Sequence, residues 1–185
     1  MPSVTLEATV PGADPAAVFT RLADFSAYPR YTAAVRKVTV TGVDDDIVAS
    51  HWSVNFRNGV LCWSERDRID LAALTIDFAQ VDGDFERFDG TWRVTAQPAA
   101  DRGDGGAHGR VGSPGPAGPA PGATQVLDVR VHFSATFDLG MPSLAAILDP
   151  VARQALTESI GLILRGLFGE HIHIAEASAT VAAGG

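Results

Sequence analysis

The sequence DPVARQALTESIGLILRGLF, at residues 149–168, predicts one long amphipathic helix. Asp149 is a good N-cap, and Pro150 has the backbone angle that suits the first position of a helix. Gly169 supplies a residue that readily ends a helix in the left-handed conformation. Apolar side chains recur at three- and four-residue spacing, so one face of the helix should be buried. The residues of this apolar stripe are Val151, Ala152, Leu156, Ile160, Ile163, Leu164, Leu167 and Phe168.

Most of the chain before this helix has the alternating pattern of β-strands. Two short helices interrupt it: one opens at Asp14-Pro15, and the other lies between Phe25 and Tyr31. The predicted strands span residues 3–10, 33–42, 46–56, 60–69, 74–81, 84–95 and 125–137. We therefore predict an α+β helix-grip arrangement, in which a curved antiparallel sheet of about seven strands surrounds the long helix.

Length and composition fit a single domain over residues 1–185. The 185 residues are 46% hydrophobic, which is enough to fill one core. Residues 97–123 are rich in Gly, Pro and Ala and lack periodicity, so they predict a flexible loop between two strands. The functional alternative for this loop is a lid over a pocket. The tail after Glu170 is small and polar, and we expect it to fray.

The charge and the cysteine count argue against several classes of function. A formal net charge of -8 disfavours binding to nucleic acid and adsorption to an anionic membrane surface. Cys62 is the only cysteine, so neither an intramolecular disulfide nor a multi-cysteine metal site is expected. We also expect neither a leader peptide nor a membrane span, and hence a cytoplasmic protein.

Two motifs in the predicted sheet resemble those of a known superfamily. Ser64-Glu65-Arg66 resembles the Ser-x-Arg strand of the polyketide aromatase/cyclases. Gly83-Asp84-Phe85, with Trp92 seven residues after Phe85, resembles a Gly-Pro-Phe…Trp hairpin that these enzymes share with the coenzyme Q-binding proteins. With the order of elements, the motifs indicate a resemblance to the START-like (SRPBCC) helix-grip superfamily over residues 3–168. The resemblance implies a hydrophobic ligand cavity between helix and sheet.

The sequence departs from the aromatase/cyclase pattern at three places. Cys62 and Val60 stand two and four residues before Ser64, where the family usually has tryptophans. Asp84 replaces the proline of the hairpin motif. No second arginine is found between residues 74 and 81. The shape of the substrate, and even the reaction, can therefore differ from aromatic ring closure.

Arg66 is the first candidate for catalysis. It shares strand parity with three small or apolar residues, which suggests that this face looks into the cavity. Those residues are Val60, Cys62 and Ser64. In the cavity the guanidinium of Arg66 would stabilise a ketone or enolate oxygen as a C–C bond forms, assisted by Ser64 and Tyr31. The alternative is that Arg66 faces solvent, because charged residues flank it on the strand.

The other candidates would line the cavity and bind the substrate. Tyr28 and Tyr31 lie in the short-helix region near its mouth, where a phenol can either reach a substrate oxygen or cap the core. Strand parity places Trp52 on the core or cavity wall, and His51 and Ser53 on the opposite face. The residues predicted to bind substrate are Tyr28, Trp52, Val60, Cys62, Phe85, Trp92, Leu156 and Ile160.

The leading hypothesis is a polyketide cyclase/aromatase that uses no cofactor and no metal. It would fold a reactive β-keto chain and promote aldol-type cyclisation and dehydration, mainly by orientation. The substrate would arrive on an acyl carrier protein, and Arg30, Arg36 and Lys37 would form the basic dock unless they are scattered surface charges. The alternative hypothesis is a non-catalytic carrier of a hydrophobic molecule such as a quinone, a polyketide or a lipid.

Overall fold

The computed structural model describes residues 1–57, 59–98 and 127–176. Within these ranges eight strands form one antiparallel sheet, in the spatial order β2-β3-β4-β5-β6-β7-β1-β8. The strands are β1 (Ser3–Pro11), β2 (Val35–Asp44), β3 (Ile47–Phe56), β4 (Gly59–Asp70), β5 (Thr75–Gly83), β6 (Arg87–Pro98), β7 (Leu127–Asp138) and β8 (His173–Glu176). The loop predicted at 97–123 lies almost wholly outside the described residues, so both of its interpretations stay predictions.

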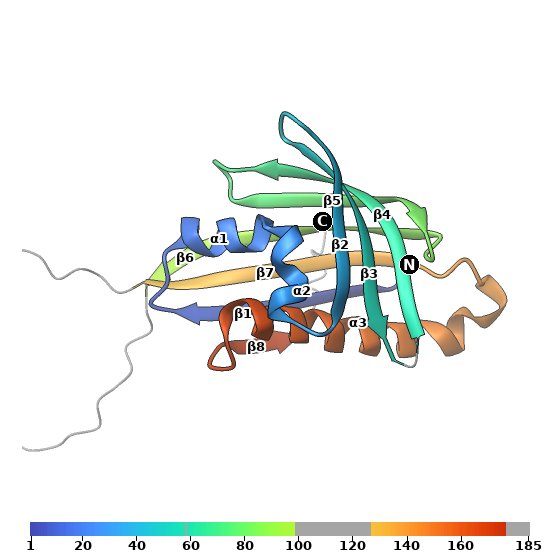
Figure 1. Ribbon diagram of the computed structural model, residues 1–185. Coiled ribbons are helices and arrows are strands. Elements are labelled where there is room, and N and C mark those ends of the chain that lie inside the picture. The colour runs from blue at the N-terminus through green and yellow to red at the C-terminus, as the bar shows by residue number, and fades with distance from the viewer. Residues whose placement is uncertain (58, 99–126, 177–185) are drawn as a thin grey trace, which may run out of the picture.

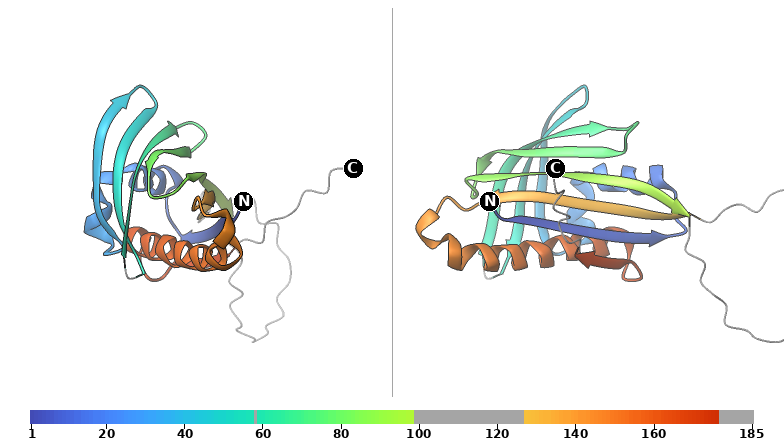
Figure 2. Two further views of the ribbon diagram at one scale, coloured as in Figure 1. Left: turned by 90° about the vertical axis from the view of Figure 1, so that its right-hand side faces the viewer. Right: turned by 180° about the vertical axis from the view of Figure 1, so that it is seen from behind.

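The sheet curls around the long helix α3 (Ala145–Phe168), which lies across the open side of the curve (Figure 1, Figure 2). Strands β2 to β6 each pair with the next strand in sequence, and β7 also pairs with β1. The core fills the space between α3 and the concave face. Leu156, Ile160 and Leu164 of the helix are buried in it, as predicted. The α+β helix-grip fold is therefore confirmed, with one strand more than expected.

The additional strand, β8, corrects the prediction that the tail after Glu170 frays. Residues 173–176 pair antiparallel with β1, from Thr9 opposite His173 to Leu6 opposite Glu176. Without β8, the backbone groups on that side of β1 would form an exposed sheet edge. The strand was missed because Ile174, which packs against the core, is its one large apolar residue. The buried Ile172 lies just before it.

Helix α3 begins one turn earlier than predicted, so Asp149 does not cap it and Pro150 lies inside it. The predicted lead-in is a short 3-10 helix, η2 (Pro142–Leu144), that runs directly into α3. Proline removes one hydrogen bond near the end of the helix, whereas Ala145 and Ala146 are strong helix formers and extend it backwards. The other end is as predicted: Gly169, with φ of 94°, donates its N–H to the carbonyl of Arg165 at 2.8 Å.

Three short helices close one end of the curved sheet (Figure 1). They are α1 (Pro15–Ala23), η1 (Phe25–Ala27) and α2 (Tyr28–Tyr31). The carboxylate of Asp14 caps α1 by accepting a hydrogen bond from the N–H of Ala17 at 2.8 Å, as the Asp-Pro signal predicted. Arg21 joins this end to α3 by donating to the carbonyl of Leu167 at 2.9 Å. No helix in the described ranges is long and apolar enough to cross a membrane.

Candidate functional site

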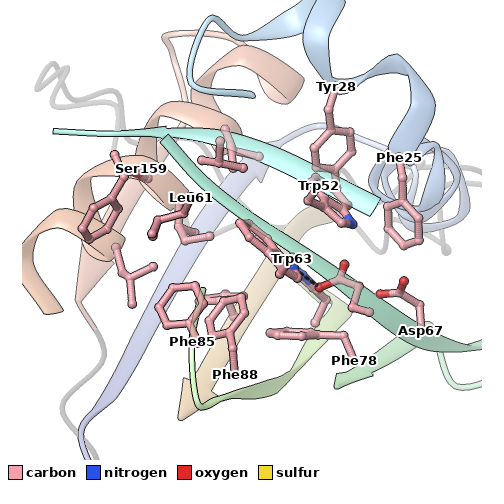
Figure 3. Close-up of a pocket in the computed structure, with 18 residues that line it drawn as sticks. Phe25, Tyr28, Trp52, Leu61, Trp63, Asp67, Phe78, Phe85, Phe88 and Ser159 are labelled. Carbon is pink, nitrogen blue, oxygen red and sulfur yellow. Dashed lines mark hydrogen bonds between the residues drawn. The ribbon is translucent and has the colours of Figure 1, made fainter. Parts of the chain in front are cut away.

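A small cavity lies between α3 and the concave face of the sheet, and Figure 3 draws the side chains around it. Its volume is about 60 Å³, which leaves room for a few water molecules. A larger ligand must therefore push side chains apart when it binds. The acidic residues Glu65 and Asp67 of β4 and the hydroxyl of Ser159 on α3 interrupt an otherwise aromatic and aliphatic lining. Its aromatic members are Phe25, Tyr28, Trp52, Phe56, Trp63, Phe78, Phe85, Phe88, Trp92 and Phe133.

Trp63 stands at the centre of the aromatic lining. Its ring stacks on that of Trp52, with the centroids 6.0 Å apart, because the two residues are direct partners across β3 and β4. Phe85 and Phe88 meet Trp63 edge-on, at 6.1 and 5.6 Å. Stacked and edge-to-face contacts of this kind add to the free energy of burial. The wall of the cavity is therefore held by mutual aromatic contacts.

The Gly83-Asp84-Phe85 motif positions this wall. Gly83 has φ of 145°, and a Cβ at this position would lie 2.5 Å from the Cα of Trp63, so only glycine fits without a shift of β4. Asp84 accepts a hydrogen bond from the backbone N–H of Cys62 at 2.6 Å. The aspartate that replaces the family's proline thus ties the β5–β6 turn to β4, and Phe85 reaches the ring of Trp63.

Glu65 and Asp67 form a buried acidic pair in the cavity, and Figure 3 labels Asp67. They are 5% and 2% exposed. Glu65 accepts a hydrogen bond from the indole N–H of Trp63 at 2.6 Å. Asp67 accepts one from the hydroxyl of Ser50 at 3.3 Å, and Ser50 accepts from the indole N–H of Trp52 at 2.8 Å. The two stacked tryptophans therefore also hold the acidic pair in place.

The surroundings of the acidic pair favour its protonation. Burial, and then the neighbouring carboxyl of Asp67, raise the pKa of Glu65 well above its ordinary value. Burial raises the pKa of Asp67 to about 7, against the opposing effect of hydrogen bonds from Ser50 and Glu65. Near neutral pH the pair therefore binds a proton more readily than two exposed carboxyls would. In the described ranges no three His, Cys, Asp or Glu side chains come together as a metal site.

Tyr28 lines the cavity, but its hydroxyl is already hydrogen-bonded within the protein. It donates a hydrogen bond to the carbonyl of Leu22 at 2.6 Å. Burial, and then the charges of Asp67 and Glu65, raise the pKa of this phenol well above its ordinary value. Tyr28 therefore stays neutral and forms a wall of the cavity, with no free O–H for a substrate oxygen.

Strand β4 faces the opposite way from the prediction. Arg66 is exposed on the outer face of the sheet and does not line the cavity, so the prediction that its face looks inward is wrong. Its neighbours of the same parity share the outer placement. They are Val60, Cys62 and Ser64. The prediction gave more weight to these small side chains than to Trp63, whose burial removes far more apolar surface from water.

The structure brings together six of the residues predicted to bind substrate. They are Tyr28, Trp52, Phe85, Trp92, Leu156 and Ile160. Tyr31 lies outside the lining and is 40% exposed, with the guanidinium of Arg21 5.1 Å from its ring centre. The sequence reasoning missed Glu65 and Asp67. Their parity with Trp63 was a usable signal, because two tryptophans on consecutive strands often face the same core.

The cavity reaches the surface between α3 and the end of β3 next to β4. Three lining residues, Phe56, Leu61 and Ser159, are only half-buried, whereas the rest are buried. Phe25 packs edge-on against Trp52 at 5.6 Å, away from this opening (Figure 3). A ligand that enters between Leu61 and Ser159 therefore meets apolar walls first and the acidic pair last.

Comparisons with known proteins agree with this fold. A family model described as "Polyketide cyclase / dehydrase and lipid transport" matches residues 11–160. The chain belongs to that family. Its place in the START-like superfamily, which the motifs indicated, is thereby confirmed. A search of curated protein sequences gives no significant match.

Solved structures of similar fold include both enzymes and proteins without a stated activity. The protein TTHA0849 from Thermus thermophilus is 22% identical, with a TM-score of 0.68 over 90% of this chain and 94% of that one. The Zhui aromatase/cyclase from Streptomyces sp. R1128 is 16% identical, with a TM-score of 0.61 over 91% and 93%. A START superfamily protein from Mycobacterium smegmatis is 14% identical, with a TM-score of 0.60 over 91% and 96%. At these identities the likeness concerns the fold.

Two truncations on α3 distinguish its core side from its cavity side. Leu164 is fully buried and outside the cavity lining, so Leu164→Ala should lower the free energy of unfolding by about 3 kcal/mol. Ile160 borders the cavity and has fewer neighbours to lose. Ile160→Ala should therefore lower the free energy of unfolding by clearly less. Urea unfolding at equilibrium measures both. Equal costs would mean that the cavity closes over Ile160 in solution.

Proposed function

We propose that this member of the polyketide cyclase/dehydrase family catalyses aldol-type cyclisation and dehydration of a β-keto chain, with Glu65 and Asp67 as acid and base. The observation that carries the proposal is a buried pair of carboxyls inside an aromatic cavity. A general acid–base group works best when its pKa lies near the working pH, which is the direction in which burial moves both groups. Cyclases of related fold lend the reaction class its plausibility.

The two carboxyls can supply both proton transfers of the C–C bond-forming step. The carboxylate of Asp67 removes a proton from the carbon between two carbonyl groups of the substrate. The resulting enolate carbon attacks a second ketone carbon of the same chain, and the acid proton of Glu65 passes to the oxygen of that ketone. The product is a cyclic β-hydroxy ketone, with Asp67 now protonated and Glu65 ionised.

Dehydration then returns the pair to its first state. Glu65 takes a second proton from the carbon next to the remaining carbonyl, the C–O bond breaks, and Asp67 gives its proton to the departing hydroxyl. One molecule of water leaves and a C=C bond forms. No oxidant or reductant is needed, because the sum of the two steps is the loss of water.

The aromatic walls contribute by orientation. A flexible poly-β-keto chain has many conformations, and a narrow cavity between Trp63 and α3 admits few of them. Holding the reacting carbons close together removes much of the entropic barrier of ring closure. The walls also exclude water, which keeps the pKa values of the acidic pair high.

The direct test is incubation of the protein with a carrier-loaded poly-β-keto chain, followed by analysis of products over time. Faster formation of cyclised, dehydrated product than in buffer, with a narrower product distribution, supports the proposal. The alternative, a non-catalytic carrier of a hydrophobic molecule, agrees with the second half of the family description. Tight binding of a stable analogue without any gain in product would establish that alternative.

The basic residues Arg30, Arg36 and Lys37 are all exposed, and we propose that they dock an acidic carrier protein. Lys37 pairs across the sheet with Ser53, and Val35 with Val54, so the start of β2 lies a few residues from Phe56 at the cavity opening. A carrier held there could deliver its chain into the cavity.

Reversing charge at this patch should therefore raise KM for a carrier-bound substrate. We expect the variant Arg36→Glu/Lys37→Glu to raise it by about tenfold or more at low salt, with a smaller effect at high salt. A small free thioester of the same chain is the control substrate, and its KM should not change. Equal effects on both substrates would mean that the change damages the cavity and not a docking surface.

A further inference from the structure

We propose that the cavity selects ligands whose buried end carries a hydrogen-bond donor, an O–H or N–H group, and rejects ligands that end in a carboxylate or a phosphate. The proposal rests on the proposed function only in taking this cavity as the ligand site, and it concerns binding, not turnover. It narrows the substrate class to neutral or cationic molecules, such as enols, phenols, alcohols and amines.

Four donors next to the acidic pair are already in use. The indole N–H of Trp63 is bound to Glu65, and that of Trp52 is bound to Ser50. The hydroxyl of Ser50 donates to Asp67, and the hydroxyl of Tyr28 donates to a backbone carbonyl. Each of these bonds joins two groups of the protein. A ligand acceptor that reached this end of the cavity would therefore find no free indole or hydroxyl donor among them.

Acceptor capacity remains, by contrast, on the acidic pair. Each ionised carboxyl has two oxygens and about four acceptor positions. One oxygen of Glu65 is bound to Trp63 and one of Asp67 to Ser50, and both side chains line the cavity. Even when the pair holds one proton, the remaining lone pairs of these oxygens are the acceptors that a ligand meets beside the pair, and an O–H or N–H group complements them.

Charge acts in the same direction. The cavity lining contains two acidic residues and, among the described residues, no Lys, Arg or His. A ligand carboxylate placed beside Glu65 and Asp67 would be a buried charge without a cationic partner, and any ionised carboxyl of the pair would repel it, which is strongly unfavourable. An ammonium group would instead face a carboxylate and the aromatic rings of Trp52 and Trp63, where cation–π attraction adds to the ion pair.

Three probes with one apolar body test the selectivity: cyclohexylmethanol, cyclohexylmethylamine and cyclohexanecarboxylate. None of them absorbs where tryptophan is excited, so quenching or shift of the fluorescence of the lining tryptophans reports binding. At pH 7 we expect the alcohol and the amine to bind at least tenfold more tightly than the carboxylate. A carboxylate that binds as tightly as either donor overturns the proposal, and so does failure of both donor probes to bind at millimolar concentration.

The variants Glu65→Gln and Asp67→Asn keep the shape of the pair and remove its charge. Each should weaken binding of the amine by about tenfold and reduce the difference in affinity between the alcohol and the carboxylate. Asp82→Asn is the matched control, because Asp82 is an exposed carboxylate on the neighbouring strand β5, and its affinities should equal those of the wild type. An unchanged probe ranking in both cavity variants would contradict the proposal, provided that they fold. If they do not fold, the wild-type ranking decides alone.

The two proposals fail separately. If the donor probes bind best but the β-keto chain gives no cyclised product, the proposed cyclase activity is wrong and the proposed selectivity stands. If cyclised product forms but the carboxylate probe binds best, the proposed selectivity is wrong and the proposed cyclase activity stands.

Discussion

We expect Asp67→Asn to lower the rate of the proposed cyclisation by about 10²–10⁴, the contribution that a positioned acid–base group typically makes. The introduced amide has nearly the same shape as the carboxyl and can still accept the hydrogen bond of Ser50, but it cannot take a proton from carbon. Binding of a neutral, stable analogue should change much less than the rate. Single-turnover product formation, alongside a fluorescence titration with the analogue, measures the two effects separately.

Arg66→Ala is the variant to compare with Asp67→Asn. Arg66 is the next residue before Asp67 on β4 but lies on the outer face of the sheet. Its removal should leave the cyclisation rate within a factor of about two, since a surface charge contributes little to chemistry in a buried cavity. A large loss in Arg66→Ala with little loss in Asp67→Asn would reverse the assignment and restore the family's arginine as the catalytic group.

The free energy of unfolding should fall as the pH rises from 5 to 8. The pKa of Asp67 is raised from its ordinary value of 3.8 to about 7, so the folded protein binds a proton that the unfolded chain has already released. The stabilisation is fully present below the unfolded pKa and is lost as the pH rises through the folded one. The shift corresponds to about 4 kcal/mol in total, most of which is lost within this pH window, and Glu65 acts in the same direction.

Urea unfolding at pH 5 and pH 8 measures this difference directly. The double variant Glu65→Gln/Asp67→Asn has no proton to lose at these positions and should have a much flatter pH dependence. Asp82→Asn, with its exposed carboxylate removed, should keep the wild-type slope. A wild-type stability that is flat or rises over this range would mean that the acidic pair is ionised in the folded protein.

The fold was predictable because its signals are redundant. The helix stripe from Leu156 to Leu164 and the alternation of the strands both follow from the large free energy of apolar burial, which local exceptions do not overturn. The errors at the ends of elements have local causes. Pro150 lies within a helix because two alanines extend it backwards, and β8 forms because an existing sheet edge pairs with a segment that has little strand character of its own.

The chemistry of the site was less predictable, because it depends on which of two faces of β4 points inward. The prediction placed Arg66 inward because the small residues Val60, Cys62 and Ser64 share its face. That choice left Glu65 and Asp67 on the outer face, where charged residues normally lie. The rule fails here because protonation and the hydrogen bonds from Trp63 and Ser50 remove most of the cost of burying the two carboxyls. That compensation involves residues on two strands and is invisible in the pattern of one.

The attachment of α3 has a mechanical consequence. At its C-terminal end the helix is fixed by the hydrogen bond from Arg21 and by the carbonyl of Tyr31, which lies so close to Gly166 that no side chain would fit there. At the other end, the first buried residue of the helix is Ala152. We therefore expect α3 to rotate about a point near Leu167 when a ligand wider than the cavity binds. A small rotation about that point would displace the start of the helix most and Ser159 less, and would widen the opening.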